Sequence, residues 1–400
     1  MNSRISTSLM YDLSLATMLA RQKKLSQLQQ QVATGQKNIT AKDDPVGVGA
    51  AVGLDRSLAE LERFGLNANT VNHRLGLQEN VLALIGDDMI RINELAVQAN
   101  TDTLSDDDRK SIAAELRAIR DNLISLANSD DGAGRYLFGG AADDVAPFTR
   151  VPGGVAYNGD QTQRRVEIAP GTFVQDTLPG SEVFMRIRTG DGVLDARMAA
   201  SNTGTGVLES FSRSTAGGWN GESYTIRFTG GDGYEVSDAN GNAVAAGTWT
   251  AKTDIEFGGL RVSISGQPAD GDELQIGPSG TRDVFATGQQ LVDALEAPVV
   301  TGADRAARRN ALQSSMRDIA RAAEAMIDAR ASGGAQMALI EDSAALREAN
   351  AVTLKTTLSG MRDLDYADAI TRFQLESTAL QTAQTVFTRM QGLSLFNLLR

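Results

Sequence analysis

The side chains that carry most enzyme chemistry are scarce in this chain of 400 residues, which contains one histidine, His73, and no cysteine. A Ser-His-Asp triad would have to use His73, and cysteine catalysis, disulfide bonds and metal sites built from several His or Cys residues are excluded. His73 lies between Asn72 and Arg74 in a segment with helical periodicity, where we expect a structural histidine. The sequence therefore gives no support to an enzymatic function, although it leaves open a pair of carboxylates acting as acid and base.

Three short motifs imitate ligand sites. The run Asp238–Asn242 resembles the start of a calcium loop, but its sixth position is Ala243 instead of Gly and its twelfth is Trp249 instead of Glu, so we expect a hairpin turn. The acidic run Asp106–Asp108 is more typical of a helix start than of a metal site. The Gly-containing run Asn202–Gly206 lacks the lysine and helix of a phosphate loop. We therefore expect no cofactor and no metal.

Charge and hydropathy exclude further classes of protein. The net charge is −12 and the isoelectric point about 4.8, which argues against a nucleic-acid surface. No uninterrupted apolar run approaches the roughly 18 residues of a membrane span. The mildly apolar stretch Leu13–Ala20 has one basic residue before it, Arg4, and no small-residue cleavage site after it. We expect a chain that is either cytosolic or exported without cleavage of a signal peptide.

The elements that would position any site are read from apolar residues repeated every seven positions, the spacing of long packed helices. The first stripe consists of Tyr11, Met18, Leu25, Val32 and Ile39. The second consists of Leu54, Leu61, Ala68, Leu75, Leu82, Met89 and Ala96. The C-terminal part has Leu312, Ile319, Met326, Ile340, Leu354 and Met361, and then Tyr366, Phe373, Leu380 and Phe387 with the flanking Met390. We expect long helices, with a kink or break at Ser332–Gly334.

Two helix starts have clear stereochemical signals. Asp43, Asp44 and Pro45 offer an aspartate N-cap followed by proline at the first helical position, where a missing N–H costs nothing. Ser105 followed by Asp106–Asp108 is similar to a capping box.

The middle of the chain changes period and composition. Residues 131–290 hold 28 of the 40 glycines, and Tyr224–Phe228 alternates apolar and polar residues as a strand does. Further expected strands are Val166–Ile168, Phe184–Ile187, Gly247–Ala251, Ile255–Phe257, Leu260–Ile264 and Glu273–Ile276. The sequence predicts an α+β fold: a long antiparallel helical bundle or coiled coil built from the N- and C-terminal segments, with an inserted antiparallel β domain.

Three regions follow from this pattern. Residues 1–42 with 359–400 are terminal helical arms, residues 43–185 with 283–358 form a rod of long helices with short β elements, and residues 186–282 form the β domain. Each arm is too short for a robust core of its own. The first arm also carries a second apolar strip, formed by Leu9, Leu13, Leu15 and Leu19. We therefore expect the stripes of both arms, including Ile39 and Met390, to be an assembly interface with copies of the same chain.

Several segments together resemble the flagellin superfamily. The run from Val32 to Pro45 is similar to its N-terminal signature, and Pro45 after the two aspartates is typical of the hook–filament junction branch. The segment Leu364–Ala367 resembles the start of the family's C-terminal arm. Motifs of the same branch occur at Arg135–Gly140, Pro147-Phe148, Tyr157–Asp160 and Leu395–Arg400.

The resemblance implies a structural role in the bacterial flagellum. It implies a ring of subunits between the first junction protein and the flagellin filament, extracellular after type III export without signal cleavage, with an export chaperone on the C-terminal arm in the cytosol. Two alternatives stay open, namely a flagellin-type filament subunit and a type III-exported adhesin or translocator that uses its β domain.

Overall fold

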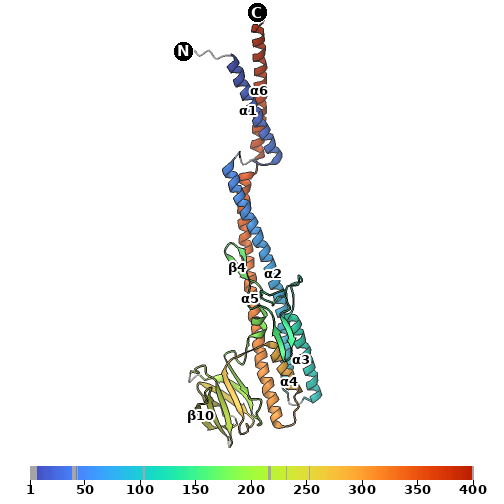
Figure 1. Cartoon of the computed structure of the whole chain (residues 1–400), viewed down its shortest axis with the longest axis vertical. Helices are drawn as coiled ribbons and strands as arrows, with labels where there is room; N and C mark the ends of the chain where they lie inside the picture. Colours follow the sequence, from blue (N-terminus) through green and yellow to red (C-terminus); the bar gives the residue numbers. More distant parts are fainter. Residues whose placement is uncertain are drawn as a thin grey trace. The chain divides into compact units, whose positions relative to one another are not determined.

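The computed structural model describes residues 7–37, 42, 44–101, 104–214, 218–230, 232–251 and 253–398 (Figure 1). Its long helices are α1 (Thr7–Thr34), α2 (Pro45–Ala99), α5 (Gly302–Arg362) and α6 (Tyr366–Leu398). The chain divides into two compact units, residues 1–66 with 342–400 and residues 67–341.

The first unit contains α1, α6, the beginning of α2 and the end of α5. Helix α2 begins at Pro45, and the N-cap is Asp44, whose Oδ1 accepts a hydrogen bond from the N–H of Gly47 at 2.8 Å. Near the end of α5, Arg362 forms an ion pair with Asp55 of α2 at 3.1 Å. Helices α1 and α6 lie side by side along their lengths (Figure 1).

Helix α5 is one continuous helix, so the expected break at Ser332–Gly334 is wrong. A glycine inside a helix costs up to about 1 kcal/mol relative to alanine, which packing on either side readily offsets. Met326 and Ala329 before the glycines and Ile340 after them are all buried. The helix therefore continues through the weak point.

The helical part of the second unit surrounds one core. It comprises residues 67–99 of α2, α3 (Asp106–Ala127), α4 (Val284–Glu296) and residues 302–341 of α5. Helix α3 begins with the predicted capping box, in which the side chains of Ser105 and Asp108 each accept a hydrogen bond from the backbone N–H of the other residue. Large side chains that are fully buried in this core include Leu82, Ile85, Met89, Ile92, Leu116, Leu123, Phe138, Phe184 and Phe285.

Two small hairpins cover the helices. They are β1 (Phe148–Val151) with β2 (Gly154–Tyr157), and β3 (Arg165–Ala169) with β4 (Thr172–Gln175). The second hairpin packs on α2 and α5, because Ile168 and Val174 share a buried cluster with Ala68, Val71, Leu75 and Ile340.

The strand expected at Phe184–Ile187 is wrong. Residues Ser181–Met185 form one turn of π-helix, and only then does β5 (Ile187–Arg188) pair with β14 (Thr281–Arg282). Phe184 is buried against three other aromatic rings, with centroids 5.0 to 5.9 Å away. This tertiary packing overrides the weak local strand preference.

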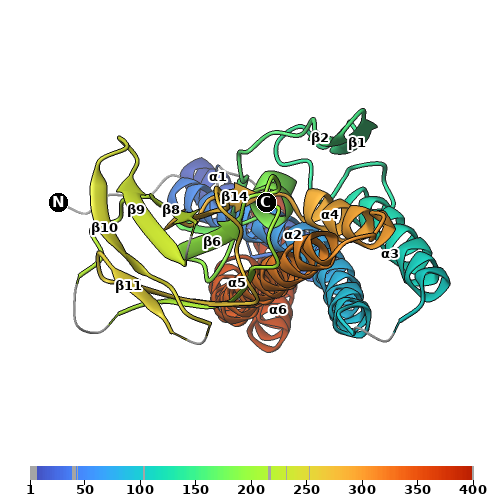
Figure 2. The same ribbon diagram turned by 90° about the horizontal axis from the view of Figure 1, so that it is seen from below.

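The inserted β domain consists of two antiparallel sheets that enclose one core. Their strand orders are β10-β9-β8-β13-β6 and β11-β12-β7. The strands are β6 (Leu194–Met198), β7 (Val207–Arg213), β8 (Tyr224–Thr229), β9 (Gly233–Asp238), β10 (Ala243–Thr248), β11 (Ile255–Phe257), β12 (Leu260–Ser265) and β13 (Glu273–Pro278). Within the second unit these sheets lie on one side of α5, and α3 and α4 on the other (Figure 2). The predicted fold class is confirmed.

One strand of this domain is displaced from its expected position, and one turn is as expected. Strand β10 ends at Thr248, so the strand expected at Gly247–Ala251 overlaps it by only two residues. The calcium-like run is a hairpin turn between β9 and β10, in which Asp238 Oδ1 accepts hydrogen bonds at 2.8 Å from the N–H groups of Asn240 and Asn242.

Candidate assembly surface on the terminal helices

The predicted stripe of the N-terminal arm is the face of α1 that lies against α6. Tyr11, Met18, Leu25 and Val32 are all half-buried, whereas most of their neighbours are exposed. The rings of Tyr11 and Phe387 meet edge to face, with centroids 5.9 Å apart. The structure therefore brings the two stripes together within one chain.

The stripe of α6 divides into half-buried and exposed members. Phe373, Leu380 and Phe387 are half-buried, but Tyr366 is 51% exposed. Ile39 and Asp43 lie outside the described residues, and only the helical backbone of Met390 is described.

Sequence reasoning missed the two most buried side chains of this helix pair. Leu28 is 6% exposed and Ala369 is 3% exposed. Leu28 follows Leu25 by three positions, so the 3-4 alternation of a packed helix could have found it. Ala369 gave no signal, because a small residue in an amphipathic helix is compatible with either face.

A short backbone clamp ties the end of α1 to the connection between α5 and α6. Helix α1 ends at Thr34, and the following Gly35 has a positive φ of 70°, the left-handed conformation typical of helix C-termini. The N–H of Leu364 donates to Gly35 O at 2.9 Å, and the N–H of Lys37 donates to Arg362 O at 2.8 Å. A Cβ at Gly35 would lie 2.9 Å from the hydroxyl oxygen of Tyr366. The glycine of the N-terminal signature is thus required by both backbone conformation and space.

One ion pair also sets the register of the two helices. Arg21 donates to Glu376 at 3.0 Å, and both side chains are partly exposed. Such pairs contribute at most about 1 kcal/mol, so apolar contact is the main source of stability here.

A second apolar strip is left uncovered on the same helix pair. Leu13 is 70% exposed and Leu375 is 68% exposed, and Leu9, Leu19 and Val386 are also exposed. Leu13, Leu375 and Val386 border a groove of about 830 Å³ between the helices, lined by Leu13, Ser14, Thr17, Met18, Arg21, Thr371, Gln374, Leu375, Thr378, Ala379, Thr382, Ala383, Val386 and Phe387. Arg21 is the only charged residue in that lining, so the groove is suited to the apolar face of another helix.

The residues considered for metal or catalytic chemistry do not form such a site. His73 is exposed on α2. Asp106 and Asp108 lie in the first turn of α3; a hydrogen bond from Arg109 lowers the pKa of Asp106, and one from Ser105 lowers the pKa of Asp108. Among the described residues, no three His, Cys, Asp or Glu side chains are grouped to hold a metal ion. No helix in the described part of the chain is long and apolar enough to cross a membrane.

A buried network of charged side chains explains the motif at Arg135–Gly140. Arg74 of α2 contacts Asp131 at 2.9 Å, Asp176 at 3.2 Å and Asp143 at 3.7 Å. Arg164 contacts Asp143 and Asp176 at 2.6 and 3.0 Å. The sequence gave no indication of this network, because its members are up to 102 residues apart.

The network anchors the loop that carries the motif. Burial raises the pKa of Asp131, but hydrogen bonds from the N–H groups of Ala133 and Arg135 and from Arg74 outweigh it, so the net pKa is lowered. Phe138 is fully buried in the helical core. Gly140 has a φ of 65°, and a Cβ there would lie 2.0 Å from the carbonyl oxygen of Asp160. The motif is therefore structural.

Comparison with known proteins shows which family this chain resembles. Residues 5–143 match the family model for the bacterial flagellin N-terminal helical region, and residues 316–399 match that for the C-terminal helical region. Flagellar hook-associated protein 3 of Salmonella typhimurium is 25% identical over 398 residues, 99% of this chain and 100% of that protein. A flagellin of Salmonella rostock is 24% identical but is matched over only 63% of its length.

Solved structures agree with this assignment. The crystal structure of Xanthomonas campestris FlgL is 59% identical, with a TM-score of 0.73, and covers 76% of this chain and 99% of that one. The flagellar hook-associated protein 3 of Legionella pneumophila is 25% identical, with a TM-score of 0.73, and covers 77% of this chain and 98% of that one. The chain therefore belongs to the family of flagellar hook-associated protein 3, or FlgL, within the bacterial flagellin superfamily.

Proposed function

We propose that this protein is a structural subunit of the flagellar hook–filament junction, and that its terminal helices join it to copies of itself and to its neighbours along the axis. The observation that carries the proposal is the uncovered apolar strip on the α1–α6 pair. Leu13 on α1 and Leu375 on α6 remain about two-thirds exposed after the two helices have packed on each other. A soluble helix pair with no further partner gains nothing from such a strip.

The energetics favour repeated contacts between subunits. Burying one leucine contributes about 1.5–3 kcal/mol. The free energy gained from a strip of several leucines exceeds the cost of association only if most of these leucines are covered. A second α1 helix carries the same apolar strip, so a neighbouring copy offers a matching surface. In a closed ring every subunit makes this contact on both sides.

The proposal extends to the layers of the assembly, its neighbours and its export, and these parts rest on the resemblance to the flagellin superfamily. Residues 1–42 with 359–400 form the inner layer, residues 43–185 with 283–358 form the next layer, and residues 186–282 face solvent. The first junction protein lies on one side of the ring and flagellin on the other. The protein reaches the cell exterior without signal cleavage, its C-terminal arm is held by an export chaperone before export, and its role is structural rather than catalytic.

A substitution experiment tests the role of the strip. Leu13→Asp and Leu375→Asp place a charge on the strip without altering the α1–α6 contact, so motility and filament attachment should be lost while the purified chain stays folded. Val244→Asp, on an exposed position of β10, is the matched control and should leave motility intact. Full motility of both strip variants would contradict the proposal.

Electron microscopy separates this function from a filament subunit. Immunogold label should lie at the boundary between hook and filament, and the purified chain should not grow long filaments. Label along the whole filament, or self-polymerisation into filaments, would favour a flagellin.

A further inference from the structure

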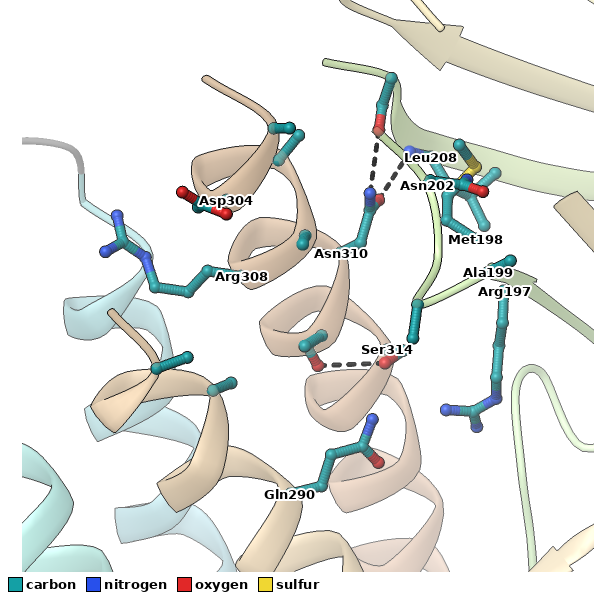
Figure 3. A pocket seen from close by; sticks show the side chains of 18 of the residues that line it. Arg197, Met198, Ala199, Asn202, Leu208, Gln290, Asp304, Arg308, Asn310 and Ser314 are labelled. Atoms are coloured by element: carbon teal, nitrogen blue, oxygen red, sulfur yellow. Dashed lines mark hydrogen bonds between the residues drawn. The ribbon is translucent and has the colours of Figure 1, made fainter. Parts of the chain in front are cut away.

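A cleft of about 350 Å³ lies within the second unit, between the β domain and the helices α4 and α5. Arg197 and Met198 line it from β6, Gln290 from α4, and Asn310 and Ser314 from α5 (Figure 3). Asn310 fixes the distance between the two sides, because its side chain accepts from Leu208 N–H and donates to Gly206 O, both at 2.9 Å. The cleft is large enough for a small organic molecule.

Besides Arg308, whose side chain points away from Arg197 (Figure 3), three arginines line this cleft, and two carboxylates pair with two of them. Arg197 donates to Asp318 at 2.7 Å and to Asp195 at 2.8 Å, and Arg282 donates to Asp318 at 3.4 Å. Arg317, the third arginine, makes no ion pair with a carboxylate in the described part of the chain. Arg317 is thus the one of these three arginines that is not directly paired with a carboxylate in the described part of the chain.

Arg317 is held by weak contacts only. Its Nη2 donates to the carbonyl oxygen of Ala196 at 3.3 Å, and its guanidinium lies 5.1 Å from the centre of the Phe211 ring. Its Nε and the Nη1 of Arg197 are buried and have no hydrogen-bond partner among the described residues. Burial is the main cause that lowers the pKa of Arg317; the nearby Asp195 and Asp318 act in the opposite direction, and the neighbouring Arg197 adds to the lowering. A partly buried guanidinium in this state is stabilised by any anion that can reach it.

The remaining lining determines what kind of anion fits. Asp304 and Arg308 point away from Arg197, on the other side of α5 (Figure 3). Asp304 already accepts from the backbone of Val300 and Thr301. Much of the remaining lining is formed by small or apolar residues, namely Met198, Ala199, Leu208, Ala294, Ala303, Ala307 and Ala311.

We propose that this cleft binds a small organic oxyanion, with a carboxylate beside Arg317 and Arg197 and a short apolar body against the alanines of α4 and α5. Binding links β6 to α5 through one ligand, so it stiffens the attachment of the β domain to the helices. The site is independent of the terminal helices and of their role in assembly.

The probes are hexanoate and hexanamide, which share the apolar body and differ in charge. Titration calorimetry on the full chain, in chloride buffer free of phosphate and sulfate, should show saturable binding of hexanoate and binding of hexanamide that is weaker by about tenfold or more. Equal affinities would overturn the proposal, because the cleft would then be merely apolar. Inorganic phosphate is the third probe, and phosphate binding as tight as hexanoate binding would overturn the assignment of an apolar body.

Variants assign the binding to this cleft. Arg317→Gln should weaken the affinity for hexanoate by about tenfold or more. Arg309 lies on the same helix, is partly exposed and pairs with Glu209, so Arg309→Gln should change that affinity by less than about twofold. Ala307→Phe adds a large side chain to the lining of the cleft while every arginine is kept, and it should also abolish binding. Circular dichroism confirms that each variant is folded. Unchanged affinity in both Arg317→Gln and Ala307→Phe, or an equal loss in Arg309→Gln, would overturn the site.

Discussion

Replacing Gly35 with alanine should loosen the clamp between α1 and α6. An L-residue in the left-handed conformation costs about 1–2 kcal/mol. The added Cβ also lies 2.9 Å from the hydroxyl oxygen of Tyr366, so that ring must move. We therefore expect the local opening of the helix pair to become more favourable by at least about 1–2 kcal/mol, which is a factor of roughly 5–30 in the population of the open state.

Hydrogen exchange of the amides of Lys37 and Leu364 measures this opening directly, because each donates across the clamp. Both amides should exchange about 5–30 times faster in Gly35→Ala. Tyr366→Phe removes the hydroxyl. In the double variant with Gly35→Ala, the stability lost through the close contact with that hydroxyl should therefore be recovered, whereas the stability lost through the left-handed backbone conformation should not.

The control is Gly360→Ala, close to the clamp on α5. A Cβ at Gly360 meets no atom within 4 Å, and the glycine is helical, so this change should be neutral or stabilise by up to about 1 kcal/mol. If Gly35→Ala exchanged at the rate of the unsubstituted chain, the argument from backbone conformation and space would be refuted.

Three further predictions concern the helix pair, the buried network and a helix cap. Leu380→Asp or Phe387→Asp should each remove about 1.5–3 kcal/mol of apolar burial and abolish filament attachment while near-ultraviolet circular dichroism shows an intact β domain; retained attachment would contradict this. The lowered pKa of Asp131 stabilises the folded state fully above about pH 4 and progressively less as pH falls through the folded pKa, so Asp131→Asn should flatten the acid side of a plot of Tm against pH. Ser105→Ala should cost α3 about 0.5–2 kcal/mol in urea unfolding, and Ser111→Ala, an exposed residue of the same helix, should cost less; equal losses would argue against the cap.

Periodicity was sufficient to predict the helices and the class of the fold, because the apolar repeat marks the face of each long helix that is at least partly buried over most of its described length. It also placed Tyr11 and Phe387 on apolar stripes of the two terminal arms, and the structure shows that these two side chains contact each other. The prediction of buried residues was incomplete where residues at more than one heptad position are buried, and for this reason it missed Leu28 and Ala369. Local patterns could not show that Phe184 lies in a π-helical turn, since that choice depends on aromatic partners distant in sequence.

Charged residues were the least predictable from the sequence. Arg74 and Arg317 look like ordinary surface residues of helices when only their neighbours in sequence are considered. Their burial depends on partners more than 100 residues away, as for Arg74 with Asp176 and Arg317 with Ala196. The same reason explains why the cleft beside the β domain has no signature in the sequence.

The distance in sequence between the two terminal helices also sets the order in which the chain folds. Arg21 and Glu376 are 355 residues apart, so closing that loop in an unfolded chain is entropically costly and slow. Once Ala68 and Ile340 have met in their shared cluster, the effective loop is about fourfold shorter, and the closure cost falls by about 1.2 kcal/mol. We therefore expect folding to proceed from the middle of the chain outward, with α1 and α6 among the last elements to find their partner.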